Sequence, residues 1–358
     1  MRSVVTPIVA LLIAAGIISI VLLALGASPL AVFVALGQGA FGTPLAFTDT
    51  LVKSTPLIFC GLAIAVAFQG AVWNIGADGQ LVIGAMAVGA IGPHLARWPH
   101  SAAILIVVAA GAAGGGLWGG LAGWLRAHRD VNEVISTIML NFVAIQLLSW
   151  AVHGPLMEPS GAFPKGVEIA PSAQLDWYFA PSRLNLGMLL GVVLAIACQL
   201  FLFHTATGFE LRAFGRNRRA SSFFGLPIAR LTRRTMVLSG ALAGLAGVVQ
   251  VSAITHRLYE SLSPGWGYEA IAVALLARLN PLAVLPTAIL FGALDNGAEA
   301  MQRSQGISPV LVQVIQALVI MILLALDTPA LARLRARKWR EAAAPAAPIP
   351  AGVETPDA

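Results

Sequence analysis

The chain has 358 residues, of which 58% are hydrophobic and only 11% are charged, and its mean hydropathy is +0.83. A soluble fold of this length needs far more polar surface, so the composition excludes a soluble protein and indicates a polytopic membrane protein. The net charge of +6 is concentrated beside apolar runs, which is typical of a cytoplasmic membrane face and not of a nucleic-acid groove. We therefore expect the lipid bilayer, and no nucleic acid, as a partner.

Apolar segments suited to membrane helices follow one another through most of the chain, since a spanning helix needs about 20 apolar residues. We predict an all-α transmembrane domain over residues 1–326 with about ten spans. These lie near 7–26, 54–73, 78–96, 101–125, 132–152, 185–203, 236–255, 269–280, 282–299 and 309–326. The eighth segment is short enough to be a half-helix.

The distribution of arginine and lysine predicts the orientation. With the N-terminus in the cytoplasm, the basic segments 126–131 and 204–234 fall inside, whereas 27–53 and 153–183 fall outside and hold few cations. Ten crossings return the C-terminus to the cytoplasm, beside a second cluster of arginines. The tail over 327–358 is rich in Ala and Pro, and we expect it to be cytoplasmic and disordered.

Two polar interruptions indicate broken helices. One is Asn74-Ile75-Gly76-Ala77-Asp78-Gly79-Gln80 and the other is Arg278-Leu279-Asn280-Pro281. Irregular backbone at membrane depth is tolerated only where protein or water satisfies it. One break in each half of the chain is the pattern expected of a transporter built from repeats.

Polar side chains inside the spans are candidates for a translocation path or for hydrogen bonding between helices. For Asn74, Asp78 and Gln80 the preferred interpretation is that they hold the helix break together, and for Gln313 and Gln316 it is hydrogen bonding between helices. Glu133, Thr137 and Asn141 share one helical face, and Gln313 and Gln316 share another. Glu133 lies near the cytoplasmic end, where a gate or a structural salt bridge is the better interpretation. The path candidates are Asn74, Asp78, Gln80, Thr137, Asn141, Gln313 and Gln316.

Catalytic and metal-binding patterns are absent from the sequence. It contains no GxxxxGK[ST], HExxH or GxSxG, and its six histidines are scattered. Cys60 and Cys198 lie within apolar segments and are interpreted as packing residues. We therefore expect no enzyme activity, no metal site and no cofactor on this chain.

The basic segment 204–234 carries seven arginines against one acid, Glu210, and lies between the sixth and seventh spans. It is the third of four motifs that occur in a fixed order. These are VWNIGADGQLVIGA, NEVISTIMLNFVA, GFELRAFGRNRRASSFFG and GYEAIAVALLARLNP. With them, residues 5–326 resemble permease subunits of bacterial ABC importers for nucleosides and simple sugars, the branched-chain amino acid/ribose-type permease family. The chain looks most like the larger permease of purine-nucleoside uptake systems.

The resemblance implies a ten-span fold like that of the vitamin B12 importer, a type II ABC importer, with a cytoplasmic coupling helix within 204–234. The positions that match the coupling motif are Gly208, Arg212, Gly215, Asn217, Ala220 and Gly225. We expect Gly208 and Gly225 to permit turns around a short amphipathic helix near 217–224. Phe223 and Phe224 would form its apolar knob. The pair Arg218-Arg219 departs from the family pattern.

The resemblance also implies partners and a location. The partners are an ATPase with two nucleotide-binding domains, which carries ATP and Mg, a second homologous permease or a second copy, and an extracytoplasmic substrate-binding lipoprotein. The location is the bacterial plasma membrane. The implied function is a translocation path for nucleosides, with simple sugars such as ribose as an alternative substrate. An ion-coupled secondary transporter is the alternative from another class, and it would need carboxylates at both helix breaks.

Overall fold

Helices account for nearly all regular structure in the computed structural model, which describes residues 2–24, 26–161, 163–175, 182–308 and 310–326. Two isolated β-bridges lie within these ranges, one between Met157 and Gly166 and the other between Lys165 and Tyr259. Six helices are long and apolar enough to cross a bilayer. They are α3 (Pro44–Gln69), α5 (His100–Arg129), α6 (Glu133–His153), α7 (Leu186–His204), α10 with its π-helical extension (Ile228–Thr255) and α12 (Pro281–Gln305). The predicted all-α membrane class is confirmed.

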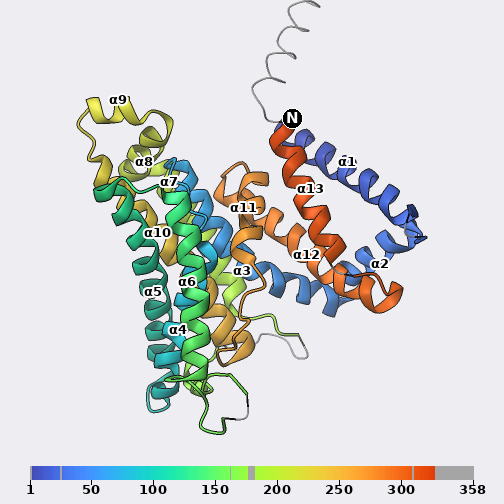
Figure 1. Ribbon diagram of the computed structural model, residues 1–358, viewed down its shortest axis with the longest axis horizontal. Helices are drawn as coiled ribbons and strands as arrows, with labels where there is room; N and C mark the ends of the chain where they lie inside the picture. The colour runs from blue at the N-terminus through green and yellow to red at the C-terminus, as the bar shows by residue number, and fades with distance from the viewer. Residues whose placement is uncertain (1, 25, 162, 176–181, 309, 327–358) are drawn as a thin grey trace, which may run out of the picture.

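The other helices surround or extend this set. They are α1 (Arg2–Ala24), α2 (Pro29–Phe41), α4 (Ala77–Ile91), α8 (Ala206–Arg216), α9 (Arg218–Phe223), α11 (Trp266–Leu276) and α13 (Val310–Leu326). In Figure 1, α4, α5, α6, α7 and α10 form a bundle, while α1, α2 and α13 stand to one side of it. The short helices α8 and α9 project from one end of the bundle.

The segment 27–53, expected as an external connection, is mostly helical. Ser28 accepts a hydrogen bond from Ala31 N, and Thr43 accepts one from Ala46 N at 3.0 Å. A proline follows each of these residues at the first helical position, where its missing N–H costs nothing. The two cap–proline pairs therefore start α2 at Pro29 and α3 at Pro44, well before the span start expected at 54.

Both predicted helix breaks exist, with shifted boundaries. The first covers Gly70 to Gly76, so Asp78 and Gln80 lie in the first turn of α4 and not in the irregular segment. The second follows α11, where Arg278 and Leu279 have φ of 52° and 58°. The side-chain oxygen of Asn280 then accepts hydrogen bonds from the first turn of α12. With 11 residues, α11 has the length of a half-helix. The tail over 327–358 lies outside the described residues.

Glycines allow α5 and α10 to approach closely in the bundle. A Cβ added at Gly240 would lie 2.3 Å from the carbonyl oxygen of Gly115, and one at Gly244 would lie 2.3 Å from that of Gly111. Backbone therefore packs on backbone along this pair, as small-residue faces permit in membranes. On the other side of α10, the stretch of α3 from Leu57 to Ala67 is completely buried.

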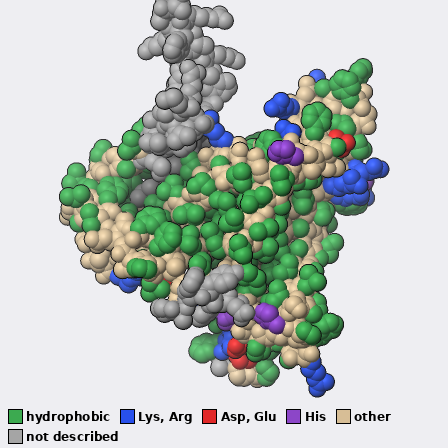
Figure 2. All heavy atoms as spheres, turned by 180° about the vertical axis from the view of Figure 1, so that it is seen from behind, with side chains coloured by type: hydrophobic (Ala, Val, Ile, Leu, Met, Phe, Trp, Pro, Cys, Tyr) green, Lys and Arg blue, Asp and Glu red, His purple; other side chains and the backbone are tan. Residues whose placement is uncertain are grey.

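The outer surface is apolar in the middle and charged at the ends. Large apolar side chains such as Leu117, Trp150 and Leu189 point outward from α5, α6 and α7. Figure 2 shows hydrophobic side chains over the middle of the visible face, with Lys and Arg gathered toward its ends. This is the surface expected of a bundle surrounded by hydrocarbon.

At the end of the bundle opposite α9, the segment after α6 is fastened to the segment before α11. Gly166 N donates to Leu258 O at 2.8 Å, and Ile169 N donates to His256 O at 2.9 Å. Lys165 donates to the Glu158 carboxylate, and this hydrogen bond holds the pKa of Glu158 below its usual range. The segment expected to be irregular is thus pinned in place by its neighbour.

We expect Gly240→Ala to destabilise the protein by about 1–3 kcal/mol, because the added methyl group forces α10 away from the backbone of α5. The measurement is the thermal unfolding midpoint of the purified chain in detergent. Gly37→Ala in α2 is the matched control, since a Cβ at Gly37 meets nothing within 4 Å. Equal midpoints for the two variants would contradict the close packing.

Candidate functional site

Five of the seven path candidates meet at the break between α3 and α4. Asn74 lies in the break, Asp78 and Gln80 lie in the first turn of α4, and Thr137 and Asn141 lie on α6. All five side chains are buried. The two motifs that contain them, near 74–80 and 132–144, are therefore halves of one structural unit.

Asn74 is the centre of the first part of this network. Its carboxamide exchanges hydrogen bonds with that of Gln80, at 2.8 and 3.0 Å, and its nitrogen also donates to Ser239 Oγ at 2.7 Å. Its oxygen accepts from Gly76 N at 2.9 Å. Ser239 in turn donates to the carbonyl oxygen of Ala63 on α3 at 2.7 Å. The break is thereby tied to α3, α4 and α10 at once.

Asn141 and Thr137 hold the break from the side of α6. Asn141 accepts from Gly79 N at 2.8 Å and donates to the carbonyl oxygen of Ile75 at 2.9 Å. Thr137 accepts from Ile75 N at 3.3 Å. The amide nitrogen of Asn141 also donates to the Tyr268 hydroxyl at 2.9 Å, so the network extends to α11.

Asp78 connects α4 to the start of α11. Its Oδ1 accepts from the Ser263 hydroxyl at 2.7 Å and from Gly267 N at 3.0 Å. The contact is tight, since a Cβ added at Gly267 would lie 2.2 Å from Asp78 N. A carboxylate that accepts two donors at a helix start is well suited to fixing two helix ends against each other.

These hydrogen bonds give the five residues a structural role, which was the preferred interpretation for Asn74, Asp78 and Gln80 and one of two equal interpretations for Thr137 and Asn141. They satisfy backbone groups that would otherwise be orphaned at membrane depth. Their lining of a translocation path stays a prediction. Three partners in the network were not predicted from the sequence, namely Ser239, Ser263 and Tyr268. A lone Ser in an apolar helix or loop carries no periodic signal that would single it out.

The remaining two path candidates, on α13, lie outside this network. Gln316 is buried and donates to Asp295 of α12 at 2.9 Å. Gln313 is exposed. The two residues that the helical spacing had placed on a common face therefore differ in exposure, and only Gln316 has a partner on α12.

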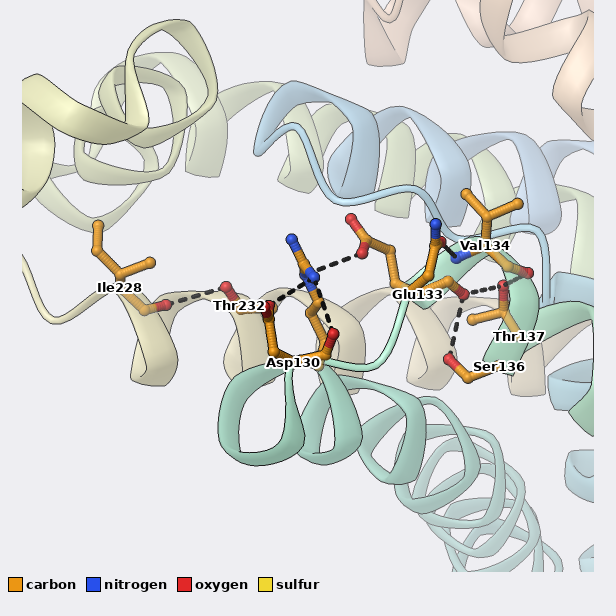
Figure 3. A network of polar contacts seen from close by, with 9 residues as sticks. Asp130, Glu133, Val134, Ser136, Thr137, Ile228 and Thr232 are labelled. Atoms are coloured by element: carbon orange, nitrogen blue, oxygen red, sulfur yellow. Dashed lines mark hydrogen bonds and ion pairs between the residues drawn. The ribbon is translucent and has the colours of Figure 1, made fainter.

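Glu133 forms a salt bridge at the junction of α5 and α6. Its Oε2 lies 2.9 Å from Nε of Arg126, and Asp130 Oδ1 lies 2.8 Å from Nη1 of the same guanidinium. Figure 3 shows the two carboxylates directed at this one cation. Glu133 therefore forms a structural salt bridge, and this salt bridge fixes the turn between α5 and α6. A gating role stays a prediction.

The segment 204–234 folds as two helices, α8 and α9, and the first of these was not expected. Gly208 was predicted at a turn, but it lies inside α8. A Cβ there would come within 2.0 Å of the carbonyl oxygen of Phe201, so the glycine allows α8 to pack on the end of α7. Gly215 likewise allows α8 to pack on the end of α3, since a Cβ added there would lie 2.0 Å from the carbonyl oxygen of Gln69.

Arg212 fastens α8 to the last turn of α7. Its Nε donates to Leu202 O of α7 at 2.8 Å, and its guanidinium lies 4.7 Å from the centre of the Phe203 ring. A cation that bonds a carbonyl in the last turn of a helix also complements the helix dipole. Three positions of the coupling motif, Gly208, Arg212 and Gly215, therefore attach α8 rigidly to the bundle.

The other positions of the motif shape α9 and its tip. Asn217 caps α9 by accepting from Ala220 N at 3.0 Å, and Gly225 ends the turn after it with φ of +77°. Phe223 and Phe224 lie edge to face and are 88% and 80% exposed. The pair lies at the C-terminal end of α9, one of the two short helices that project from the bundle in Figure 1. Exposed aromatics in such a position mark an interaction surface.

The segment also proves shorter than expected, because α10 begins at Ile228 and not at 236. The arginines at 230, 233 and 234 therefore belong to the first turns of α10. Among the described residues, no group of three or more His, Cys, Asp or Glu is arranged to hold a metal ion.

Comparisons with known proteins identify relatives of this arrangement. The family model described as "Branched-chain amino acid transport system / permease component" matches residues 46–324. A guanosine ABC transporter permease of Bacillus subtilis is 32% identical, with 88% of this chain and 91% of the relative covered. A nucleoside ABC transporter permease of Lactococcus lactis is 31% identical, covering 89% and 90%. A glucose ABC transporter permease of Haloferax volcanii is 30% identical, covering 89% and 86%.

We expect Asp78→Ala to damage folding more than any substrate affinity. It removes the acceptor for Ser263 and Gly267, and each buried donor left without a partner costs about 1–3 kcal/mol. The measurement is the monodisperse fraction and thermal midpoint in detergent. Asp130→Asn is the control, because that side chain is 92% exposed, Asn tolerates the φ of 52° at this position, and the ion pair that is lost contributes at most about 1 kcal/mol. A stable Asp78 variant with altered selectivity would reverse the structural assignment.

Proposed function

The chain belongs to the family of branched-chain amino acid transport system permease components, and from that premise we propose that it forms a translocation path for nucleosides in an ATP-driven importer. Its relatives are transport subunits and not enzymes. The observation that carries the proposal is the projecting pair α8–α9, rigidly attached to the bundle and tipped with exposed aromatics. Relatives named for guanosine and nucleoside transport support the substrate class.

The orientation that we propose places α9 in the cytoplasm. Basic residues gather at that end of the bundle, at the end of α5, on α8 and α9 and at the start of α10. In Figure 1 the N-terminus and the end of α13 lie toward the same side as α9. Arginine-rich ends face the cytoplasm in inner-membrane proteins. This supports a plasma-membrane protein with both termini inside, and the ten-span fold of the vitamin B12 importer type remains our proposal for its complete topology.

We propose that α9 docks into a groove of a separate ATPase that binds ATP and Mg²⁺ in its two nucleotide-binding domains. Phe223 and Phe224 form the apolar contact, and the arginines around them suit an acidic rim. The remaining partners are a second homologous permease and an extracytoplasmic substrate-binding lipoprotein.

The attachment of α8 gives a physical route from the ATPase to the path. A displacement of α9 moves α8, and α8 contacts the last turn of α3 through Gly215 and Gln69. Leu211 of α8 also packs at Gly70, the first residue of the break. The break therefore moves with α8 as one body, and the helices α4 and α11 that it holds are carried along. Alternating access needs such a rigid link between the energy source and the helices around the path.

Uptake by the reconstituted importer tests the proposal. We expect accumulation of radiolabelled guanosine that requires ATP on the cytoplasmic side and requires this subunit, with competition by other nucleosides. Competition by ribose or glucose, and not by nucleosides, would support the sugar alternative. Accumulation that persists without ATP and follows an ion gradient would support a secondary transporter and contradict our proposal.

We expect Phe223→Ala/Phe224→Ala to weaken association with the ATPase by about thirtyfold or more, since truncation of an aromatic anchor costs about 2 kcal/mol. The measurement is the dissociation constant of the purified ATPase for the permease in detergent, together with uptake. Phe41→Ala/Phe163→Ala removes two exposed rings elsewhere and is the control. Undiminished association in the first variant would remove α9 from the coupling contact.

A further inference from the structure

A cleft lies where the end of α5 meets the start of α10, outside the coupling contact. Its volume is about 360 Å³, and it is lined by His128 and by the turn from Pro227 to Arg230, together with Arg233. Figure 3 shows this junction, with Ile228 and Thr232 of α10 beside the end of α5. The proposed transport mechanism uses none of the lining residues.

The cleft carries positive charge that the chain does not neutralise. Arg230 and Arg233 are exposed, and none of the salt bridges of the described residues involves either of them. The two carboxylates at the junction of α5 and α6, Asp130 and Glu133, are directed at Arg126 instead. The arginines therefore present unpaired donors to whatever occupies the cleft.

The backbone at the cleft adds to this charge. Pro227 precedes the first turn of α10 without a capping side chain, and the first bond of the helix runs from Leu231 N to Pro227 O. The N–H groups of Ile228, Ala229 and Arg230 have no partner within the helix, and they lie at its positive end. Side chains and backbone thus favour an anion of several oxygens in the same place.

An apolar strip leads from the cleft along the bundle. On α5, Leu117, Leu121 and Trp124 are exposed at helical spacing, with Leu117 at 77%. Val237 and Leu238 are exposed on the adjoining turns of α10. The Trp124 ring stacks on His128 of the cleft, with 5.6 Å between the ring centres. Trp is the residue typical of the level between headgroups and hydrocarbon.

We propose that this cleft binds the phosphate headgroup of an anionic phospholipid of the surrounding leaflet, with the acyl chains along the strip of α5 and α10. A free phosphate ion would use the cations but not the strip. An acidic surface of the ATPase would also leave the strip unused, and the exposed aromatics for that contact lie on α9. A bound lipid would fix the start of α10, against which α5 packs through its glycines.

Native mass spectrometry of the full-length chain, purified in detergent, tests the proposal with three probes. They are phosphatidylglycerol, phosphatidylcholine with the same acyl chains, and inorganic phosphate. We expect tighter binding of phosphatidylglycerol than of either other probe. Arg230→Gln/Arg233→Gln should weaken it by about twenty-five-fold, at roughly a factor of five for each arginine near a membrane surface.

Arg97→Gln/Arg303→Gln is the control, since it removes the same charge from exposed positions outside the cleft, and it should leave phosphatidylglycerol binding unchanged. Equal binding of the two phospholipids to the unaltered chain would overturn the proposal. Inorganic phosphate that binds as tightly as phosphatidylglycerol would make the cleft a site for free anions. A cleft variant that loses the ATPase but retains phosphatidylglycerol would make it a protein-docking surface, again contrary to our proposal.

Discussion

The backbone that leaves helical geometry between α3 and α4 is the feature on which the rest of the structure depends. Inside a bundle surrounded by hydrocarbon, its N–H and C=O groups have no water to bond. Asn74, Thr137 and Asn141 supply the partners, and Asp78 extends the same network to the start of α11. Satisfying one short break therefore fixes the relative positions of α3, α4, α6, α10 and α11.

The same break links the interior to the surface that we assign to coupling. Glycines at 208 and 215 bring α8 into backbone contact with the ends of α7 and α3. A side-chain contact in either place would be softer, since long side chains adjust their rotamers when pushed. Backbone contact transmits displacement with little loss because packed interiors have low compressibility. We propose that the small residues of the coupling motif make this attachment stiff, and that the exposed aromatics provide the contact with a partner.

Much of the fold could be predicted from the sequence. The length of an apolar segment indicates a membrane span and the placement of arginines indicates its orientation, and neither signal requires knowledge of the tertiary structure. Most helices fall near the expected spans. The start of α3 and the helix α2 were missed although Ser28-Pro29 and Thr43-Pro44 are local capping signals. The helix α8 was missed because a cluster of arginines obscured the apolar pair Leu211 and Phe214, which are buried. The aromatic tip was found because its residues follow a motif.

By itself, the sequence determined that the chain is an all-α membrane protein and that two of its helices are broken. These properties follow from composition and from Gly and Pro positions, which are local. The role expected of Phe223 and Phe224 came instead from the resemblance of the basic segment to a family motif. Only the tertiary structure decided what the buried polar residues do. Asn74 and Asn141 are 67 positions apart in the numbering, yet both bond the same irregular turn. Which residues meet across 67 positions of sequence depends on how the helices pack against one another. The spacing of residues along one helix does not reveal which residues of another helix they contact.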